Sequence, residues 1–146
     1  MCGIFGFLSP RGSRRDVPGD GIFKSIAELA RVGSLSVETL AEAAARPEGA
    51  RVVSLLEAAQ AEAYRWLGPE GFIEVLTHPS VEARLRETAS TLRGWLERLE
   101  GSLQSGGPRR QNEQELVNRL LVGGQDVLWQ LERDLLDNLA PVRSLL

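Results

Sequence analysis

The fold of this chain is decided by the stretch SVEARLRETASTLRGWLERLEGSL, residues 80–103. Apolar side chains recur in it every three or four residues, a pattern typical of an α-helix with one buried face. They are Val81, Leu85, Ala89, Leu92, Leu96, Leu99 and Leu103. Ser80 precedes this stripe and is a residue type that caps helix N-termini. The stretch therefore predicts one long helix, capped by Ser80, that packs against other helices.

The same periodicity continues upstream. It predicts helices over residues 22–33, 36–46 and 52–67, and a short helical turn over residues 72–76. Asp20 is placed to cap the first of these helices. Pro47 is expected to break the second helix, and Gly68-Pro69 to end the third.

Downstream, Gly106-Gly107-Pro108 indicates a flexible linker over residues 104–110. Asn112 and Glu115 then have the spacing of a capping box, which opens another helix. Gly123-Gly124 is expected to interrupt or kink that helix, because glycine is a poor helix former. An apolar face continues from residue 127 to 139; core burial is its default role, although it could dock a partner helix.

The N-terminus differs from the rest of the chain. Residues 4–8 are short, apolar and punctuated by glycine, as in a buried strand, and turn-forming residues follow. No later segment clearly supplies a strand to pair with it. We therefore predict a mainly α fold, a bundle of five to seven helices preceded by one short strand. Residues 1–20 form the strand and loop, and residues 21–146 form the helical region.

Composition excludes several functional classes. The chain of 146 residues has a formal net charge of −3, which argues against a general nucleic-acid surface. It has one cysteine and one histidine, so neither a disulfide framework nor a cysteine–histidine zinc site is expected. No apolar run is long enough to span a membrane, and no basic segment precedes an apolar one as in a secretory signal. We expect a cytoplasmic protein with no metal, cofactor, nucleic-acid or membrane partner.

Cys2 is the residue with the clearest chemistry. Removal of Met1 would leave Cys2 with both a thiol and a free α-amino group. A thiol titrates near ~8.5 and an α-amine near ~7.7–8.0, so the amine can accept the thiol proton around neutral pH. One residue then supplies nucleophile and base. Gly3 leaves room beside the reacting carbon, and the strand that follows would hold Cys2 in place.

The opening Met1-Cys2-Gly3-Ile4-Phe5-Gly6-Phe7 resembles the start of the class-II glutamine amidotransferases. That family includes glutamine–fructose-6-phosphate aminotransferase, asparagine synthetase and amidophosphoribosyltransferase. The resemblance implies that Cys2 attacks the side-chain amide of glutamine and releases ammonia for an acceptor, for which we favour a sugar phosphate. It also implies that residues 4–8 are the first strand of an N-terminal-nucleophile domain, a layered α/β/β/α sandwich.

The family's other motifs have no counterpart in these 146 residues. Arg11-Gly12-Ser13 does not fit the family's Arg-Gly-x-Asp-Ser segment. Arg65-Trp66-Leu67-Gly68 lacks the threonine of its Arg-Trp-x-Thr stretch. No Asn precedes a Gly, so the oxyanion-hole pair is missing, and the residues that bind glutamine are unknown. We therefore expect the N-terminal part of a longer amidotransferase, inactive as this chain alone.

Other chemistry-bearing residues have simpler interpretations. His78 lies between two predicted helices and is expected in a loop. Trp66, Trp95 and Trp129 are expected in the core. Arg109-Arg110 is expected to be solvated. The wet face of the last helix is expected to consist of Glu132, Arg133, Asp134 and Asp137, where Arg133 and Asp137 have the spacing of an i,i+4 ion pair.

The alternative hypothesis is a small helical protein-interaction module without catalytic activity. The match at its N-terminus would then be accidental, and Cys2 an apolar residue. Retention of Met1 on the natural protein would favour this alternative.

Overall fold

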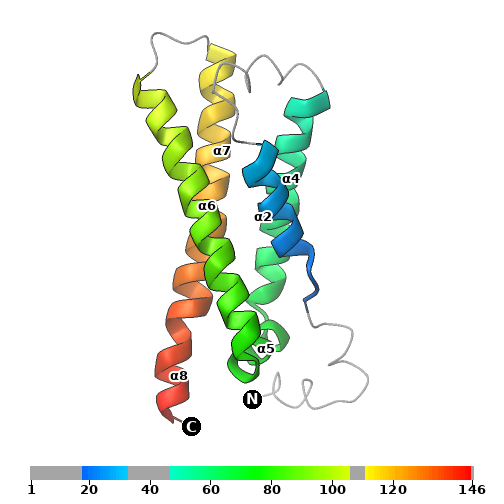
Figure 1. The fold of residues 1–146 in the computed structure, drawn as a ribbon, viewed down its shortest axis with the longest axis vertical. Helices are drawn as coiled ribbons and strands as arrows, with labels where there is room; N and C mark the ends of the chain where they lie inside the picture. Colours follow the sequence, from blue (N-terminus) through cyan, green and yellow to red (C-terminus); the bar gives the residue numbers. More distant parts are fainter. Residues whose placement is uncertain (1–17, 33–46, 106–110, 146) are drawn as a thin grey trace.

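The computed structural model describes residues 18–32, 47–105 and 111–145 (Figure 1). This part of the chain is almost entirely helical and contains no strand. The prediction of a mainly α fold is thus confirmed for it. The strand predicted over residues 4–8 and the helix predicted over 36–46 lie outside the described residues.

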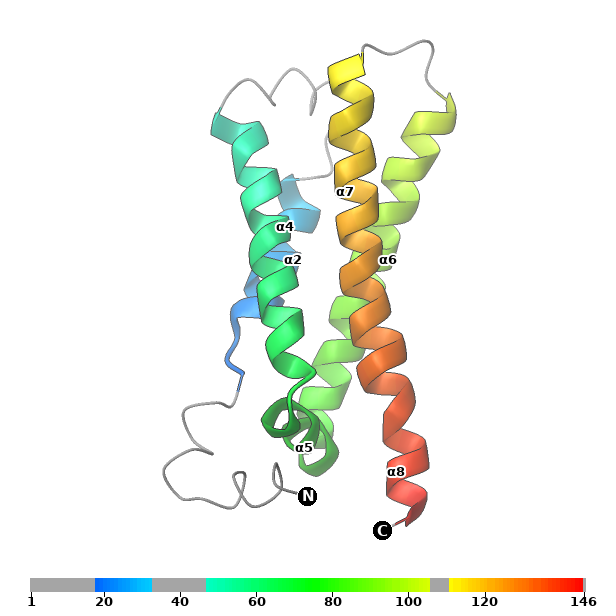
Figure 2. The ribbon, with the colours of Figure 1, turned by 180° about the vertical axis from the view of Figure 1, so that it is seen from behind.

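Four helices lie side by side along the long axis of the molecule: α2 (Gly21–Val32), α4 (Pro47–Trp66), α6 (Pro79–Ser105) and α7 (Gln111–Trp129). α2 packs against α4 and α6 on one side, and α7 packs against the same two helices on the other (Figures 1 and 2). α4 and α7 run in one direction along the axis, and α2 and α6 run in the other. The short helix α5 (Pro69–Thr77) joins α4 to α6 at one end of the bundle.

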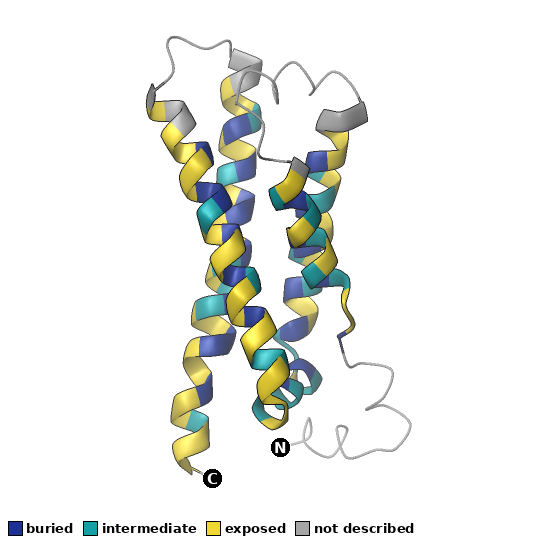
Figure 3. Ribbon diagram, viewed as in Figure 1, coloured by how far each residue is buried: buried dark blue, intermediate teal, exposed yellow. Residues whose placement is uncertain are grey.

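The core lies where the apolar faces of these helices meet (Figure 3). In α6, the buried apolar side chains are Leu85, Ala89, Leu92, Trp95, Leu96 and Leu99. The stripe read from residues 80–103 is confirmed in this central part. Each fully buried leucine contributes about 1.5–3 kcal/mol relative to an exposed one. No polar or charged residue is wholly buried in the described part of the chain.

The start of α6 differs from the prediction. The helix begins at Pro79, and Ser80 lies inside its first turn, so Ser80 is not the N-cap. Proline is favoured at this position because the first-turn N–H has no partner within the helix. The carbonyl of His78 accepts hydrogen bonds from the N–H groups of Val81, at 3.0 Å, and Glu82, at 3.3 Å.

Three other boundaries also differ from the prediction. α4 begins at Pro47, five residues before the predicted start of this helix at residue 52. α6 continues to Ser105, so the first two residues of the predicted linker are helical and residues 106–110 lie outside the described part. α7 begins at Gln111, so Asn112 lies inside the helix and does not precede it. Helix ends are the least specified part of a periodic pattern.

Gly123 and Gly124 do not interrupt α7, which is continuous through both. They lie where α7 approaches its neighbours closely. A Cβ atom on Gly123 would lie 2.7 Å from Cδ2 of Leu56 in α4. A Cβ atom on Gly124 would lie 2.6 Å from Cδ2 of Leu96 in α6. The glycine pair therefore serves close helix packing.

The change in helix geometry comes later. Residues Gln130–Leu135 form a π-helical turn, η1, and Leu136–Asn138 form a 3₁₀ turn, η2. The last helix is α8 (Leu139–Leu145). Pro141 lies in the first turn of α8, where its missing N–H costs little.

We expect the same substitution at two glycines to have opposite effects. Gly124→Ala should lower the free energy of unfolding by about 1–3 kcal/mol, because buried Leu96 cannot move aside without disturbing the core. Gly101→Ala should raise it by up to about 1 kcal/mol, because nothing lies within 4 Å of the new methyl group and alanine is the better helix former. Urea denaturation of both variants measures the effect. A Gly124→Ala variant as stable as Gly101→Ala would contradict the close-packing role.

Candidate functional site

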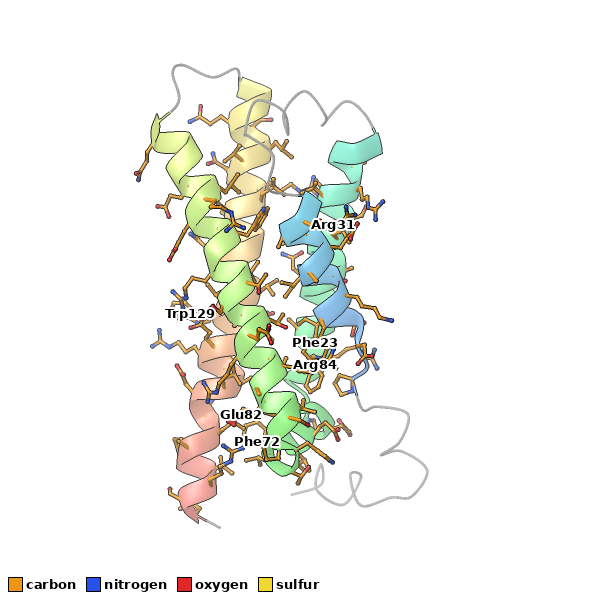
Figure 4. All side chains as sticks on the ribbon, viewed as in Figure 1. Phe23, Arg31, Phe72, Glu82, Arg84 and Trp129 are labelled. Atoms are coloured by element: carbon orange, nitrogen blue, oxygen red, sulfur yellow. The ribbon has the colours of Figure 1, made fainter. Side chains whose placement is uncertain are left out.

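Cys2 lies outside the described residues, so the structure begins 16 residues after it, at Pro18. The first described residues, which lead into α2, contact the bundle. Pro18 is buried, and the carboxylate of Asp20 lies 3.4 Å from Nη1 of Arg84 in α6. The guanidinium of Arg84 also lies over the ring of Phe23 in α2, 3.9 Å from its centroid (Figure 4). These contacts hold the start of α2 against α6.

A shallow cavity of about 360 Å³ lies beside this point, between α2 and α6. It is lined by Phe23, Lys24, Ile26, Ala27, Arg84, Glu87, Thr88 and Thr91. Lys24 is the single lysine of the chain. A ligand in this cavity would meet two cations, one carboxylate and two hydroxyl groups, so charge and hydrogen bonds would hold it.

Trp66 closes the other side of the α2 N-terminus. It is 2% exposed and packs edge-to-face on Phe23, with ring centroids 6.1 Å apart, so its predicted place in the core is confirmed. Its Nε1 and the Oε2 atom of Glu62 are buried without hydrogen-bond partners. Arg65 is partly exposed and pairs with Oε1 of Glu62 at 3.5 Å. Arg65 and Trp66 therefore do not act together as one binding group.

His78 lies in the connection between α5 and α6, as predicted. Its ring is exposed, and Nδ1 lies 2.9 Å from Oγ1 of Thr77 and 3.5 Å from Oε1 of Glu74. All of these partners are local. His78 therefore serves as the residue between the end of α5 and the start of α6.

Trp129 does not lie in the core, where the sequence predicts it. Trp95 is buried as predicted, but Trp129 is 56% exposed on the outer face of α7. Its position could have been found from the helical wheel. Trp129 stands two residues from buried Val127 and two from buried Leu131, and two residues turn an α-helix by about 200°.

Arg133 covers one face of Trp129, with its guanidinium carbon 4.4 Å from the ring centroid. Such cation–π contacts contribute about 0.5–1 kcal/mol at exposed sites. The predicted i,i+4 ion pair of Arg133 with Asp137 is wrong, because the salt bridges among the described residues do not include it. Both residues lie at the π-helical and 3₁₀ turns, where α-helical spacing does not apply.

Trp129 and Arg133 border a cavity of about 440 Å³ between α6 and the π-helical turn. Its other lining residues are Arg93, Gln125, Leu128, Glu132 and Asp137. Arg93 donates hydrogen bonds to both carboxylate oxygens of Glu132, each at 2.5 Å. This hydrogen bonding raises the pKa of Arg93. The site thus combines an exposed indole with fixed charges of both signs.

Glu82 links α8 to the start of α6. Its Oε1 accepts hydrogen bonds from Arg143 at 2.9 Å and from Arg86 at 3.3 Å. The hydrogen bond from Arg143 is the main cause of a lowered pKa for Glu82; desolvation opposes it, and Arg86 adds to it. A similar bridge joins Arg119 of α7 to Glu57 of α4 at 2.9 Å.

No protein-family model, curated protein or solved structure matches this chain. Within residues 18–32, 47–105 and 111–145, no helix is long and apolar enough to cross a membrane. The same residues contain no group of three or more His, Cys, Asp or Glu side chains placed to hold a metal ion.

Trp129 should account for most of the quenchable tryptophan fluorescence, because Trp66 and Trp95 are shielded from solvent. We expect Trp129→Phe to reduce quenching by acrylamide sharply. Arg133→Ala should increase quenching, because it uncovers one face of the indole. Trp95→Phe, checked for folding by circular dichroism, is the control and should leave quenching nearly unchanged. Unchanged quenching in Trp129→Phe would place Trp129 in the interior.

The Glu82 bridge should make stability depend on pH. Because folding lowers the pKa of Glu82 below its ordinary 4.5, the contribution is present above that value and is lost as pH falls through the folded-state pKa. We expect Glu82→Gln to cost up to about 1 kcal/mol of unfolding free energy at neutral pH and almost nothing at about pH 3. Denaturant titrations at the two pH values measure this. Glu87→Gln on the same helix is the control; an equal loss for Glu82→Gln at both pH values would exclude the bridge as its cause.

Proposed function

We propose that Cys2 is the nucleophile of a glutamine amidotransferase and that this chain is its N-terminal part. One observation carries the proposal. Cys2-Gly3-Ile4-Phe5-Gly6-Phe7 begins at the second position of the chain, where removal of Met1 frees the amine of the cysteine. The single cysteine of the sequence stands at the one place where its own amine can act as base.

The proposed reaction uses both groups of Cys2. The α-amine takes the thiol proton, and the thiolate attacks the side-chain amide carbon of glutamine. The C–N bond breaks as the resulting ammonium group returns the proton to the leaving nitrogen, which departs as ammonia. Water then hydrolyses the glutamyl thioester, giving glutamate and restoring the thiol. The ammonia acceptor we favour is a sugar phosphate, as in the aminotransferase branch of the family.

This chain supplies only part of such a site. An oxyanion hole normally contributes a large share of the rate, and losing one donor costs about 10²–10³ in turnover. No Asn-Gly pair exists in the sequence to form that hole. Groups that would orient the glutamine carboxylate are also unassigned, and poor orientation forfeits much of the gain from proximity. The remaining groups would come from further sequence of the same enzyme.

We expect the 146-residue chain to release no glutamate from glutamine above background, and a longer chain that includes the remaining glutaminase motifs to do so. In the longer chain, Cys2→Ala should abolish glutamate release and leave ammonia-dependent synthesis intact, because the thiol acts only in releasing ammonia. A coupled glutamate assay and a synthesis assay with ammonium salt measure the two activities. Robust hydrolysis by the short chain would reveal a complete site in it. Unchanged glutamate release in the Cys2→Ala variant would remove the family assignment.

The state of the N-terminus can be tested on this chain directly. An aldehyde probe condenses with a cysteine that carries both a free thiol and a free α-amine, forming a thiazolidine. Intact-mass spectrometry should show a processed protein without Met1 that gains the mass of the probe less water. The Cys2→Ala variant is the control and should gain nothing. A native protein that mainly retains Met1 would exclude the amine as base.

A second candidate function is that of a helical protein-interaction module. It is favoured by two exposed apolar residues of α7, Trp129 and Val122, which is 60% exposed and lies seven residues, about two helical turns, earlier. Tryptophan and arginine are the residues most enriched at interaction hot spots, and Arg133 lies on Trp129. This candidate requires Trp129 and not Cys2, so loss of function in a Cys2→Ala variant separates the two.

A further inference from the structure

Four buried side chains near the end of α7 have an unusual spacing. Val127, Leu131, Leu135 and Leu139 follow one another at intervals of four residues, and each is 0–1% exposed. An α-helix has 3.6 residues per turn, so each step of four residues overshoots a full turn by about 40°. Over the three steps the overshoot reaches about 120°. A regular α-helix would therefore turn Leu139 away from the face that buries Val127.

The π-helical turn corrects this drift. The N–H of Leu136 is shared between the carbonyls of Glu132, four residues back, and Leu131, five residues back. A bond to the fifth residue marks a turn that holds one residue more than an α-turn. The 3₁₀ turn follows at once, with the N–H of Leu139 bonded to the carbonyl of Leu136. The π-helical turn Gln130–Leu135, called the wide turn below, thus unwinds the helix where the leucine spacing requires it.

The side chain of Asn138 supports the same region. Its amide donates a hydrogen bond to the carbonyl of Asp134 at 2.8 Å. In a regular α-helix the main-chain N–H of residue 138 would make this bond. The asparagine thus provides a side-chain donor to this carbonyl in the segment where the helix geometry changes.

We propose that the wide turn accommodates one surplus residue of the helix and thereby corrects the register of the buried residues on either side of it. It lets the part before Gln130 pack against α4 and α6 and keeps Leu136 and Leu139, after the turn, buried as well. The surplus residue itself is dispensable. This proposal concerns the α7–α8 helix and does not depend on Cys2.

Removing one exposed residue from the turn should restore regular spacing. Without Asp134, the intervals between the four buried residues become four, three and four, which is the spacing of an ordinary amphipathic α-helix. Ion pairs with α6 on both sides of the deleted residue should keep the helix in its position. Before the missing residue, Glu132 pairs with Arg93, and after it Arg143 pairs with Glu82.

The chain offers a matched control in the same helix. Asp126 and Asp134 are both exposed aspartates, one in the regular part of α7 and one in the wide turn. Deleting Asp126 rotates the two parts of the helix by about 100° relative to each other. Because the wide turn comes after Val127, it cannot correct the register of that residue. Either Val127 leaves the core, or Gly123 and Gly124 leave their contacts with α4 and α6.

The first experiment compares thermal unfolding of the two deletion variants by circular dichroism. We expect deletion of Asp134 to shift Tm by no more than about 5 °C, and deletion of Asp126 to lower it by about 15 °C or more or to abolish cooperative unfolding. Asp134→Ala and Asp126→Ala should both stay within a few degrees of the original. A deletion of Asp134 as damaging as that of Asp126 would overturn the proposal.

The second experiment tests the hydrogen bond of Asn138 in both backgrounds. Asn138→Ala should lower the Tm of the full chain by roughly 2–6 °C, the effect of losing one hydrogen bond in a domain of this size. In the chain that lacks Asp134 the loss should be less than half as large, because a regular helix supplies a main-chain donor. Equal losses in the two backgrounds would show that deletion does not restore the α-helix and would overturn the proposal.

Discussion

The close approach of α7 to α4 and α6 is the constraint on which the rest of the bundle depends. Adjacent residues on a helix point about 100° apart, so Gly123 meets α4 while Gly124 meets α6. Leu56 and Leu96 occupy the space that two Cβ atoms would need. Because protein interiors are packed as densely as organic crystals, α7 has one rotation about its axis that satisfies both contacts.

That rotation determines what each later residue of the helix faces. It turns Val127 inward, so Trp129, two residues on, must face outward, where Arg133 covers it. It also requires the leucines at four-residue intervals to return to the same face, which a regular α-helix cannot do. The π-helical turn and the exposed indole are therefore two consequences of one packing contact.

The sequence predicts the parts of this fold that rest on periodicity. The stripe of α6 is readable because burial repeats with the helix, and its central residues lie in the core as predicted. The sequence predicts an interruption at the glycine pair, since the intrinsic cost of about 1 kcal/mol per glycine is visible in sequence while the packing that outweighs it is not. It predicts Ser80 as the cap, but Pro79 can also begin a helix. For Trp129, residue type suggested burial, but the angle about the helix axis placed it outside.

The candidate nucleophile is readable for a different reason. The chemistry of Cys2 needs only two groups of one residue, so a short motif can indicate it without any knowledge of the bundle. The reaction also requires Cys2 to be held in position. Fixing the backbone costs about 1–2 kcal/mol per residue, so a thiol is held against a substrate only where other contacts offset that cost. Among the described residues, the ion pair of Asp20 with Arg84 joins the start of α2 to α6. Our proposal therefore needs the contacts of a complete glutamine site, which the motifs missing from this sequence would supply in a longer enzyme.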